Sequence, residues 1–510
     1  MNRRKFIQLS AISAGAAMAG VKQVIGADTA PINPMSNVVD KAARAVVLPK
    51  SPTIVLPIGV APLAKEPLDP MFDDMRSRAG VNVLMTFIYT HEPHRAGMVL
   101  EGGKVPGFRG GNYAKPHMQY YKDQPLTLED MSAPEFGGVD VLERVIPVAA
   151  KHGIKVFPFI LEDNSMPALV KNWEGMYEVD HHGRRANGHP GGPCHNNPGY
   201  LNFTRGLLED YARSYDIGGF MWGSERQSGL LNALCISQSN GQDPGKATCF
   251  CEFCVAKGRA QGIDVERARK GFGEVEAFVT ASRKGVKPRD GFFTTFWRIL
   301  LKYPEVLAWE NLWATSRHEF QAALYQHVKG INPKLPMGWH IWQNITFSPF
   351  QRAEENLEEM AVYSDFLRPS VYNNVAGGRF VTFVKDARTT VLGDLTPQSA
   401  LEVVYQQMNY DEAPIDKLAA TGFSAQYVER EVRRTVDSVV GHPVQVWPGV
   451  DIDVPVGADE SHCTPESVGQ AVTAAFMGGA QGIILSRNYT EMKPENLSGA
   501  GKAMRDLKLI

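Results

Sequence analysis

Eight short apolar segments, separated by amphipathic stretches, constrain the fold of this chain more than any other feature of its sequence. They span residues 53–60, 82–89, 155–160, 218–222, 336–342, 365–372, 444–450 and 482–486. Their nearly continuous apolar character is typical of strands buried on both faces, as in a parallel sheet. The stretches between them predict helices at 139–151, 200–214, 308–329, 398–407, 425–440 and 467–477. Eight such alternations, followed by a short helix over 499–508, predict an α/β fold of the (β/α)8 TIM-barrel type.

The alternative is an open, doubly wound sheet with additional strands. A dinucleotide-binding version of that fold carries G-x-G-x-x-G after its first strand, whereas this chain reads GVAPLAKEP there, from Gly59 to Pro67. The number of strands favours the barrel, which we expect to span residues 50–510. Two intervals are longer than a loop and one helix. Residues 90–138 predict an active-site loop, and residues 224–334 predict an inserted, cysteine-rich helical subdomain after the fourth strand.

The first 30 residues resemble an export signal. Arg3 and Arg4 precede a weakly apolar stretch over 9–21, and small residues follow at Gly26 and Ala27. Adjacent arginines before a short apolar segment indicate twin-arginine export, and the segment is too short to span a bilayer. We therefore expect a signal peptide over residues 1–30 and a periplasmic or secreted protein. Because this route exports folded proteins, a metal can be bound before export.

The composition limits the class of partner. Apolar residues make up 44% and charged residues 21% of the chain, which is typical of a globular enzyme. The net charge of −2, without basic blocks, argues against nucleic acid as a partner. No later segment has the length and apolarity of a membrane span.

Polar and aromatic residues follow the predicted strands, where a TIM barrel places its chemistry. Aromatic faces pack against sugar rings, and amides and carboxylates bind sugar hydroxyls. We therefore expect a saccharide substrate to contact Glu162, Trp222, His340, Trp342, Tyr372, Asn373, Trp447 and Arg487. By strand alternation His340 and Trp342 share one side, opposite Trp339 and Ile341. Whether that side faces the barrel mouth or a packed core is left open.

Hydrolysis of a glycosidic bond requires two carboxyl groups, one protonated and one ionised. Glu225 follows the apolar strand GGFMW, so we expect desolvation to raise its pKa, as suits a general acid. Asp451 and Asp453 follow the seventh strand, and either could supply the second carboxylate. The alternative is that these residues cap the following helices. Glu162 and Glu92 are the reserve candidates for the acid.

Four cysteines lie within twenty residues, at Cys235, Cys249, Cys251 and Cys254. Their spacing predicts a closed tetrahedral zinc site, which would be structural because no position is left for water. Two disulfides, natural in an oxidising compartment, are the alternative. Cys194 and Cys463 receive no assignment.

Four histidines gather ahead of the fourth strand, at His181, His182, His189 and His195. A metal site is one interpretation. A polar, glycine-rich substrate loop is favoured, because the histidines lack helical i, i+4 spacing.

The segment CHNNPGYLNFTRGLLEDYARSYDIGGFMWGSERQSG, together with CFCEFCVAKGRAQGID, resembles the glycosidase-like barrels known as hypothetical glycosyl hydrolases. More distantly it is similar to the zinc-containing family 42 β-galactosidases. The resemblance covers about residues 50–375 and is strongest over 194–260. That family carries Cys-x-Cys-x2-Cys and an earlier fourth cysteine, matched here by Cys249, Cys251, Cys254 and Cys235. It implies a barrel, a zinc ion and a carbohydrate substrate.

Three departures from this family stand out. Its acid/base lies in an Asn-Glu pair after the fourth strand, where this chain has Ser224-Glu225. Its nucleophile is a glutamate after the seventh strand, where this chain has Asp451 and Asp453. Its cysteines follow the third strand, whereas these follow the fourth. The resemblance therefore implies the barrel and the zinc, but not a retaining mechanism.

The sequence thus predicts an exported glycoside hydrolase that cleaves an oligosaccharide or polysaccharide with paired carboxylates. A sugar lyase or epimerase on the same barrel is the first alternative, because a fold does not fix its chemistry. A catalytically inactive carbohydrate-binding protein is the second.

Overall fold

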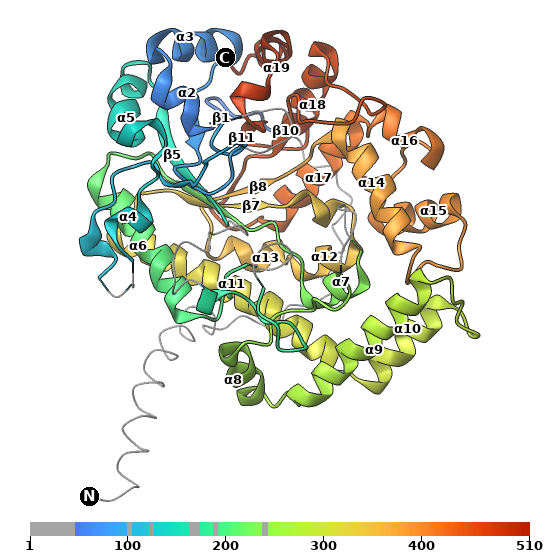
Figure 1. Ribbon diagram of the computed structural model, residues 1–510. Coiled ribbons are helices and arrows are strands. Elements are labelled where there is room, and N and C mark those ends of the chain that lie inside the picture. Colours follow the sequence, from blue (N-terminus) through green and yellow to red (C-terminus); the bar gives the residue numbers. More distant parts are fainter. Residues whose placement is uncertain are drawn as a thin grey trace, which may run out of the picture. The chain divides into compact units, whose positions relative to one another are not determined.

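Parallel strands surrounded by helices form the centre of the computed structural model (Figure 1). The structure describes residues 46–98, 105–122, 124, 126–162, 174–186, 192–236 and 243–510. Residues 1–30, predicted as an export signal, and His189 lie outside this part. The strands of the main sheet are β1 (Thr53–Ile58), β2 (Val83–Thr86), β5 (Lys155–Leu161), β6 (Phe220–Gly223), β7 (Met337–Ile341), β8 (Phe366–Pro369), β9 (Gln445–Val446), β10 (Gly449–Asp451) and β11 (Gly482–Ser486).

The sheet closes on itself through residues 445–451. The strand order runs β10-β11-β1-β2-β5-β6-β7-β8-β9, all parallel. β9 pairs with β8 and β10 pairs with β11, so this one segment joins both ends of the order. Pro448 separates its halves, since proline has no N–H to donate to a ladder. The predicted eight-stranded α/β TIM barrel is confirmed, with its seventh strand interrupted.

Side chains fill the barrel interior. One cluster gathers alternate residues from the strands: Val55, Val83, Met85, Phe87, Phe157, Phe159, Leu161, Met221, Phe366, Trp447 and Ile484. Trp447 stacks on Phe366 with ring centroids 3.9 Å apart, so it belongs to this packed interior. Trp222 points to the other side of β6 and packs against Phe320 and Trp339. Both tryptophans, expected to bind substrate, are core residues.

Helices cover the outside of the barrel, as the amphipathic stretches predict (Figure 1). Local signals set their starts: Asn197 accepts a hydrogen bond from Gly199, and Thr464 forms a capping box with Ser467. The helices are α2 (Val60–Lys65), α3 (Leu68–Ala79), α5 (Val141–Lys151), α6 (Pro198–Ser214), α12 (Pro349–Glu354), α13 (Leu357–Ala361), α14 (Asn373–Ala387), α15 (Pro397–Met408), α16 (Ile415–Thr421), α17 (Ala425–Ser438), α18 (Pro465–Met477) and α19 (Pro494–Asp506). Within the described residues, no helix has the length and apolarity needed to cross a membrane.

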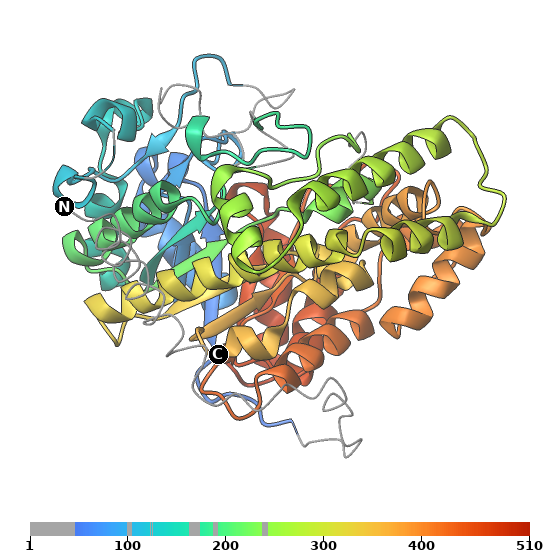
Figure 2. The ribbon, with the colours of Figure 1, turned by 90° about the horizontal axis from the view of Figure 1, so that it is seen from below.

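The two long intervals carry their own elements. After β2 come the antiparallel pair β3 (Tyr89–Thr90) and β4 (Gly111–Asn112), and α4 (Leu128–Met131). After β6 come α7 (Gly229–Leu234), α8 (Glu252–Ala260), α9 (Val265–Arg283), α10 (Phe292–Lys302) and α11 (Glu305–Ile331). Figure 2 shows α9, α10 and α11 packed together. Trp309 of α11 stacks on Phe250 with centroids 4.4 Å apart, which ties the cysteine-rich loop to α11.

Candidate functional site

A pocket of about 130 Å³ opens at the C-terminal ends of the barrel strands. It is strongly charged. Its ionisable lining residues are His94, Arg95, Glu225, His340, Arg368, Arg379, Arg487 and Glu491, and its aromatic ones are Phe87, Phe159, Trp342 and Tyr372. We call it the barrel-mouth pocket. Five residues expected from the sequence lie here: Glu225, His340, Trp342, Tyr372 and Arg487.

Glu225 and His340 form a pair inside this pocket. Glu225 follows β6 and His340 lies on β7, and the Nε2 atom of His340 lies 2.9 Å from Oε1 of Glu225. Gly223 is paired with His340 across the two strands. A Cβ atom on Gly223 would lie 2.6 Å from Cβ of His340, so only glycine leaves room for the imidazole.

Arg368 fixes the orientation of the imidazole. Its Nη1 lies 2.5 Å from Nδ1 of His340. Because a guanidinium group can only donate, Nδ1 accepts this bond and Nε2–H donates to Glu225. Burial and the nearby Arg368 charge lower the pKa of His340 to about 4, against the opposing effect of Glu225. His340 is therefore neutral at pH 7.

Glu225 is ionised, contrary to the expectation from its apolar strand. Burial does act to raise its pKa, but the hydrogen bond from His340 and the charges of Arg95 and Arg379 outweigh it and lower the pKa to about 2. The side chain remains 35% exposed. The prediction of a raised pKa is thus wrong, because positive groups that lie far apart in sequence surround the carboxylate. An ionised, accessible carboxylate suits a base or a nucleophile.

Asp451 and Asp453 do not face Glu225 in this pocket. The Asp451 carboxylate is fully buried and accepts hydrogen bonds from the backbone of Val375 and Val454. Asp453 accepts from Lys493 N and Asn496, at the start of α19. Both aspartates hold chain segments in place, and neither lines the pocket, so the expected pairing of Glu225 with Asp451 or Asp453 is not found. Among the described residues, the other carboxylate lining the barrel-mouth pocket is Glu491.

Glu162 and Asn373, expected to bind substrate, are instead buried structural residues. Glu162 accepts hydrogen bonds from Ser224, Arg226 and Tyr200 and is 3% exposed. Asn373 donates to the backbone oxygen of Phe423. Neither residue lines the pocket. Glu162 connects the ends of β5 and β6 and so holds the loop that carries Glu225.

Four cysteine sulfurs converge beside α8, and they can hold a metal ion. They belong to Cys194, Cys249, Cys251 and Cys254, and each residue is at most 5% exposed. Sγ of Cys194 lies 3.4 Å from Sγ of Cys254 and 3.5 Å from Sγ of Cys251. Tetrahedral coordination with metal–sulfur bonds of about 2.3 Å separates sulfurs by about 3.8 Å, close to these distances. We call these four residues the cysteine cluster.

The expected ligand Cys235 is not part of this cluster. Cys235 ends α7 in a left-handed conformation, with φ of 54°. The fourth thiol comes from Cys194, in the loop after β5, which the spacing within the cysteine-rich segment could not indicate. None of the six cysteines, all of which lie in the described part of the chain, forms a disulfide.

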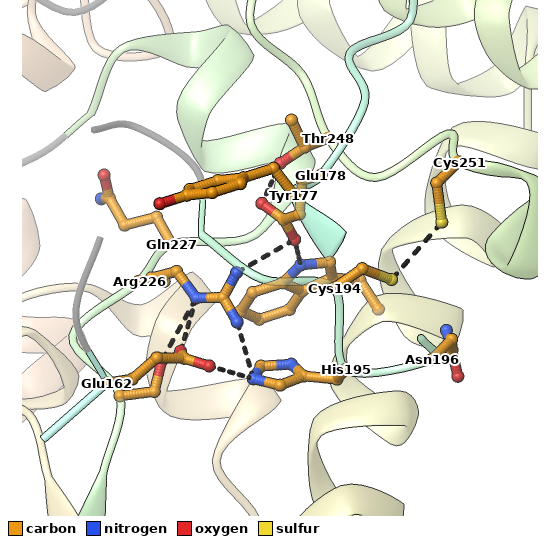
Figure 3. A network of polar contacts seen from close by, with 12 residues as sticks. Glu162, Tyr177, Glu178, Cys194, His195, Asn196, Arg226, Gln227, Thr248 and Cys251 are labelled. Atoms are coloured by element: carbon orange, nitrogen blue, oxygen red, sulfur yellow. Dashed lines mark hydrogen bonds and ion pairs between the residues drawn. The ribbon is translucent and has the colours of Figure 1, made fainter. Parts of the chain in front are cut away.

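A buried polar network joins the cysteine cluster to the loop that carries Glu225 (Figure 3). The Nη2 atom of Arg226 donates to Nε2 of His195, the neighbour of Cys194, over 2.7 Å. Nε of Arg226 donates to Glu162 over 2.6 Å, and its Nη1 lies 3.5 Å from Glu178. Glu178 accepts from Thr248, the neighbour of Cys249. Arg226 is thus linked to the neighbours of two cluster cysteines: directly to His195, next to Cys194, and through Glu178 to Thr248, next to Cys249.

His181 and His182 also meet a carboxylate. Their Nε2 atoms lie 2.9 Å and 2.7 Å from the same oxygen of Glu276, on α9. These three residues could hold a metal ion, and they also tie their loop to α9. His195 lies apart from them, in the Arg226 network.

Sequence reasoning missed three pocket arginines: Arg95, Arg368 and Arg379. One signal was present, because Arg368 is a charged residue inside the apolar segment DFLRPSVY and pairs with His340 in the β7–β8 register. Arg95 and Arg379 lie in a loop and on a helix, where an arginine carries no such signal.

The chain has no match among family models or curated proteins. Among solved structures it is similar to α-L-fucosidase isoenzyme 2 from Paenibacillus thiaminolyticus, with 14% identity and a TM-score of 0.45, covering 90% of this chain and 49% of that one. A β-galactosidase from the psychrophilic Marinomonas ef1 has 10% identity and a TM-score of 0.48, covering 90% and 61%. One from Halorubrum lacusprofundi has 12% identity and a TM-score of 0.47, covering 90% and 58%. This chain thus spans about half to three-fifths of their length.

Proposed function

We propose that this chain is a glycoside hydrolase-like enzyme that binds a saccharide at the barrel-mouth pocket. The observation that carries the proposal is the Glu225 carboxylate, which is ionised, accessible and oriented by a neutral His340. It lies at the C-terminal end of the barrel, where TIM barrels place their chemistry. Trp342 and Tyr372 add aromatic surface to the same pocket.

Glu225 would act in its ionised form. Such a carboxylate can attack the anomeric carbon or remove a proton from the attacking water. His340 donates Nε2–H to Oε1, which leaves Oε2 without a hydrogen bond from any described residue. We assign the reaction to this second oxygen. The general acid is not assigned.

β-Elimination on an acidic sugar, the chemistry of a sugar lyase, is the second candidate. The observation that favours it is Arg379, a guanidinium group in the same pocket as the ionised Glu225. In this reaction Glu225 would remove the proton next to a sugar carboxylate, the C–O bond to the leaving group would break, and a C=C bond would form. An epimerase would return the proton instead. The unsaturated product absorbs ultraviolet light, which distinguishes elimination from hydrolysis.

The experiment is a panel of neutral and acidic glycosides and polysaccharides, tested with the parent and with Glu225→Gln. Loss of the reacting carboxylate should lower turnover by about 10²–10⁴-fold, on activated and natural substrates alike. Glu402→Gln, an exposed residue on α15, is the matched control and should leave turnover unchanged. Equal turnover by Glu225→Gln and the parent would remove Glu225 from the mechanism. Binding without turnover by the parent would indicate a carbohydrate-binding protein.

We also propose that the cysteine cluster holds a structural zinc ion. Four thiolates fill a tetrahedral shell and leave no position for water or substrate. The bound metal would join the loop after β5 to the segment around α8, since these two segments supply its ligands. It would contribute to stability rather than to the reaction.

Twin-arginine export, with a periplasmic or secreted mature protein, remains our proposal for localisation. It rests on Arg3 and Arg4 and the apolar stretch after them. Replacing both arginines with lysine should keep the precursor in the cytoplasm, as followed by cell fractionation. Normal export of that variant would contradict the proposal.

A further inference from the structure

The barrel-mouth pocket is unusually rich in guanidinium groups. Arg95, Arg368, Arg379 and Arg487 line it, and they come from a loop, strand β8, helix α14 and the end of β11. Two of them have carboxylate partners. Arg487 donates to Glu491 over 2.9 Å, and Nε of Arg95 lies 3.1 Å from Glu92. The other two have none among the described residues.

Arg368 is engaged by neutral groups alone. Besides His340, its guanidinium group donates to Ser486 over 2.7 Å and to the hydroxyl groups of Ser370 and Tyr372. It is 3% exposed. Gly449 makes room for it, since a Cβ there would lie 2.6 Å from Nη2. Arg368 therefore positions His340 and Tyr372. It also brings to the pocket a positive charge that no carboxylate among the described residues pairs with.

Arg379 is different, because most of its donors are not in use. Its Nη1 donates to Oε1 of Gln343 over 2.7 Å, and this is the one hydrogen bond it makes to a described residue. The side chain is half-buried on α14 and lines the pocket. A planar guanidinium group with available N–H donors matches the two oxygens of a carboxylate.

The electrostatics of the pocket agree with this geometry. Burial lowers the pKa of Arg379, and Arg487 acts in the same direction, while Tyr372, Glu225 and Asp451 oppose them. Attraction to the nearby groups therefore does not fully offset the effect of burying the Arg379 charge. Leaving a charged group partly desolvated without a paired partner costs free energy, which an anionic ligand would recover.

We propose that the barrel-mouth pocket takes a saccharide that carries an anionic substituent, a uronic acid carboxylate or a sulfate ester, and that Arg379 binds this anion. This substrate class rests on the proposed carbohydrate function. Glu225 and Arg379 lie close enough for the charge of each to shift the pKa of the other. The anion and the reacting bond therefore fit on one sugar or on neighbouring sugars.

The test is calorimetric titration with matched ligands: galacturonate against galactose, glucuronate against glucose, and galactose 6-sulfate. The parent should bind the acidic or the sulfated sugars about 10–100-fold more tightly than the neutral ones, as expected for a charge-assisted hydrogen bond. Arg379→Gln should lose this preference. Arg289→Gln, at a side chain that is 93% exposed, should keep it. Arg379→Lys retains the charge without the planar fork and should keep part of the preference for carboxylates.

Two results would overturn the substrate class. One is equal or tighter binding of the neutral sugars, and the other is an acidic preference that survives in a folded Arg379→Gln protein. If neutral glycosides are cleaved with a dependence on Glu225 and no anionic preference, this inference fails while the proposed function stands. If no saccharide of the panel is bound or cleaved, both fail.

Discussion

The cysteine cluster and the barrel-mouth pocket are two polar centres with opposite designs. The cluster gathers four side chains of one kind, each at most 5% exposed, with all sulfur atoms turned toward one point. The pocket gathers charges of both signs, leaves Glu225 35% exposed and leaves donors of Arg379 available. A closed set of ligands can only hold an ion, whereas an open set of mixed charge can bind and change a molecule.

The two centres are nevertheless connected. Arg226 follows Glu225 in the chain and is bonded to His195, next to Cys194. The cluster can therefore hold the loop of Glu225 in place without contacting a substrate. We therefore assign stability to the cysteines and chemistry to the pocket.

The largest effect should come from the cysteine cluster. Cys194→Ser removes one of four metal ligands, so the purified protein should lose most of its bound zinc. Its free energy of unfolding should fall by about 4 kcal/mol or more, as expected when a structural metal is lost. Elemental analysis and denaturant unfolding measure the two effects.

Cys235→Ser is the matched control, since its thiol is buried but lies outside the cluster. It should keep one zinc per chain. If Cys235→Ser loses the metal and Cys194→Ser keeps it, the ligand set inferred from the structure is wrong and the one inferred from the sequence is right.

Arg226→Met should give the next largest effect. It leaves Glu162 and Glu178 buried without their cationic partner, which typically costs about 3–5 kcal/mol. Arg213→Met is the comparison, because the Arg213 side chain is 48% exposed and pairs with Glu209 at the surface. Its loss should lower the free energy of unfolding by about 0–1 kcal/mol. Urea unfolding compares the two. Equal losses would show that the buried Arg226 contributes no more to stability than an exposed ion pair.

The fold was largely predictable from the sequence, because each strand is a local apolar run. All eight expected segments became strands, since a strand buried on both faces needs apolar residues at nearly every position. The interruption at Pro448 did not change the topology. Boundaries of helices such as α6 followed their own caps, which are also local.

The site was predictable only where it follows a strand. His340, Trp342 and Glu225 lie within strands or directly after them, and all three line the barrel-mouth pocket. Trp222 was expected to contact substrate but packs against the helix layer. Side chains along a strand alternate between the two sides of the sheet, so a shift of one position reverses the assignment. The pKa of Glu225 and the ligand Cys194 depend on segments far away in sequence, which no local pattern encodes.

The smallest expected effect is a shift in pH dependence. Activity should require ionised Glu225 and neutral His340, so kcat/KM should fall as the pH drops through about 4, where His340 takes up a proton. Arg368→Met removes a positive charge that lowers this pKa, so the acid limb should move to higher pH. Arg289→Met should leave it unchanged. An acid limb that does not respond to Arg368 would separate His340 from the reaction.

Turnover of the cadmium-exchanged protein tests most directly whether the metal of the cysteine cluster is structural while the pocket carries out the reaction. Cadmium accepts the same four thiolates, so a closed structural site predicts that kcat/KM stays within about twofold of the zinc protein. The same sample should still lose activity when Glu225 is replaced by glutamine. A change in turnover of about tenfold or more with the identity of the metal would place the metal in the reaction and contradict the account.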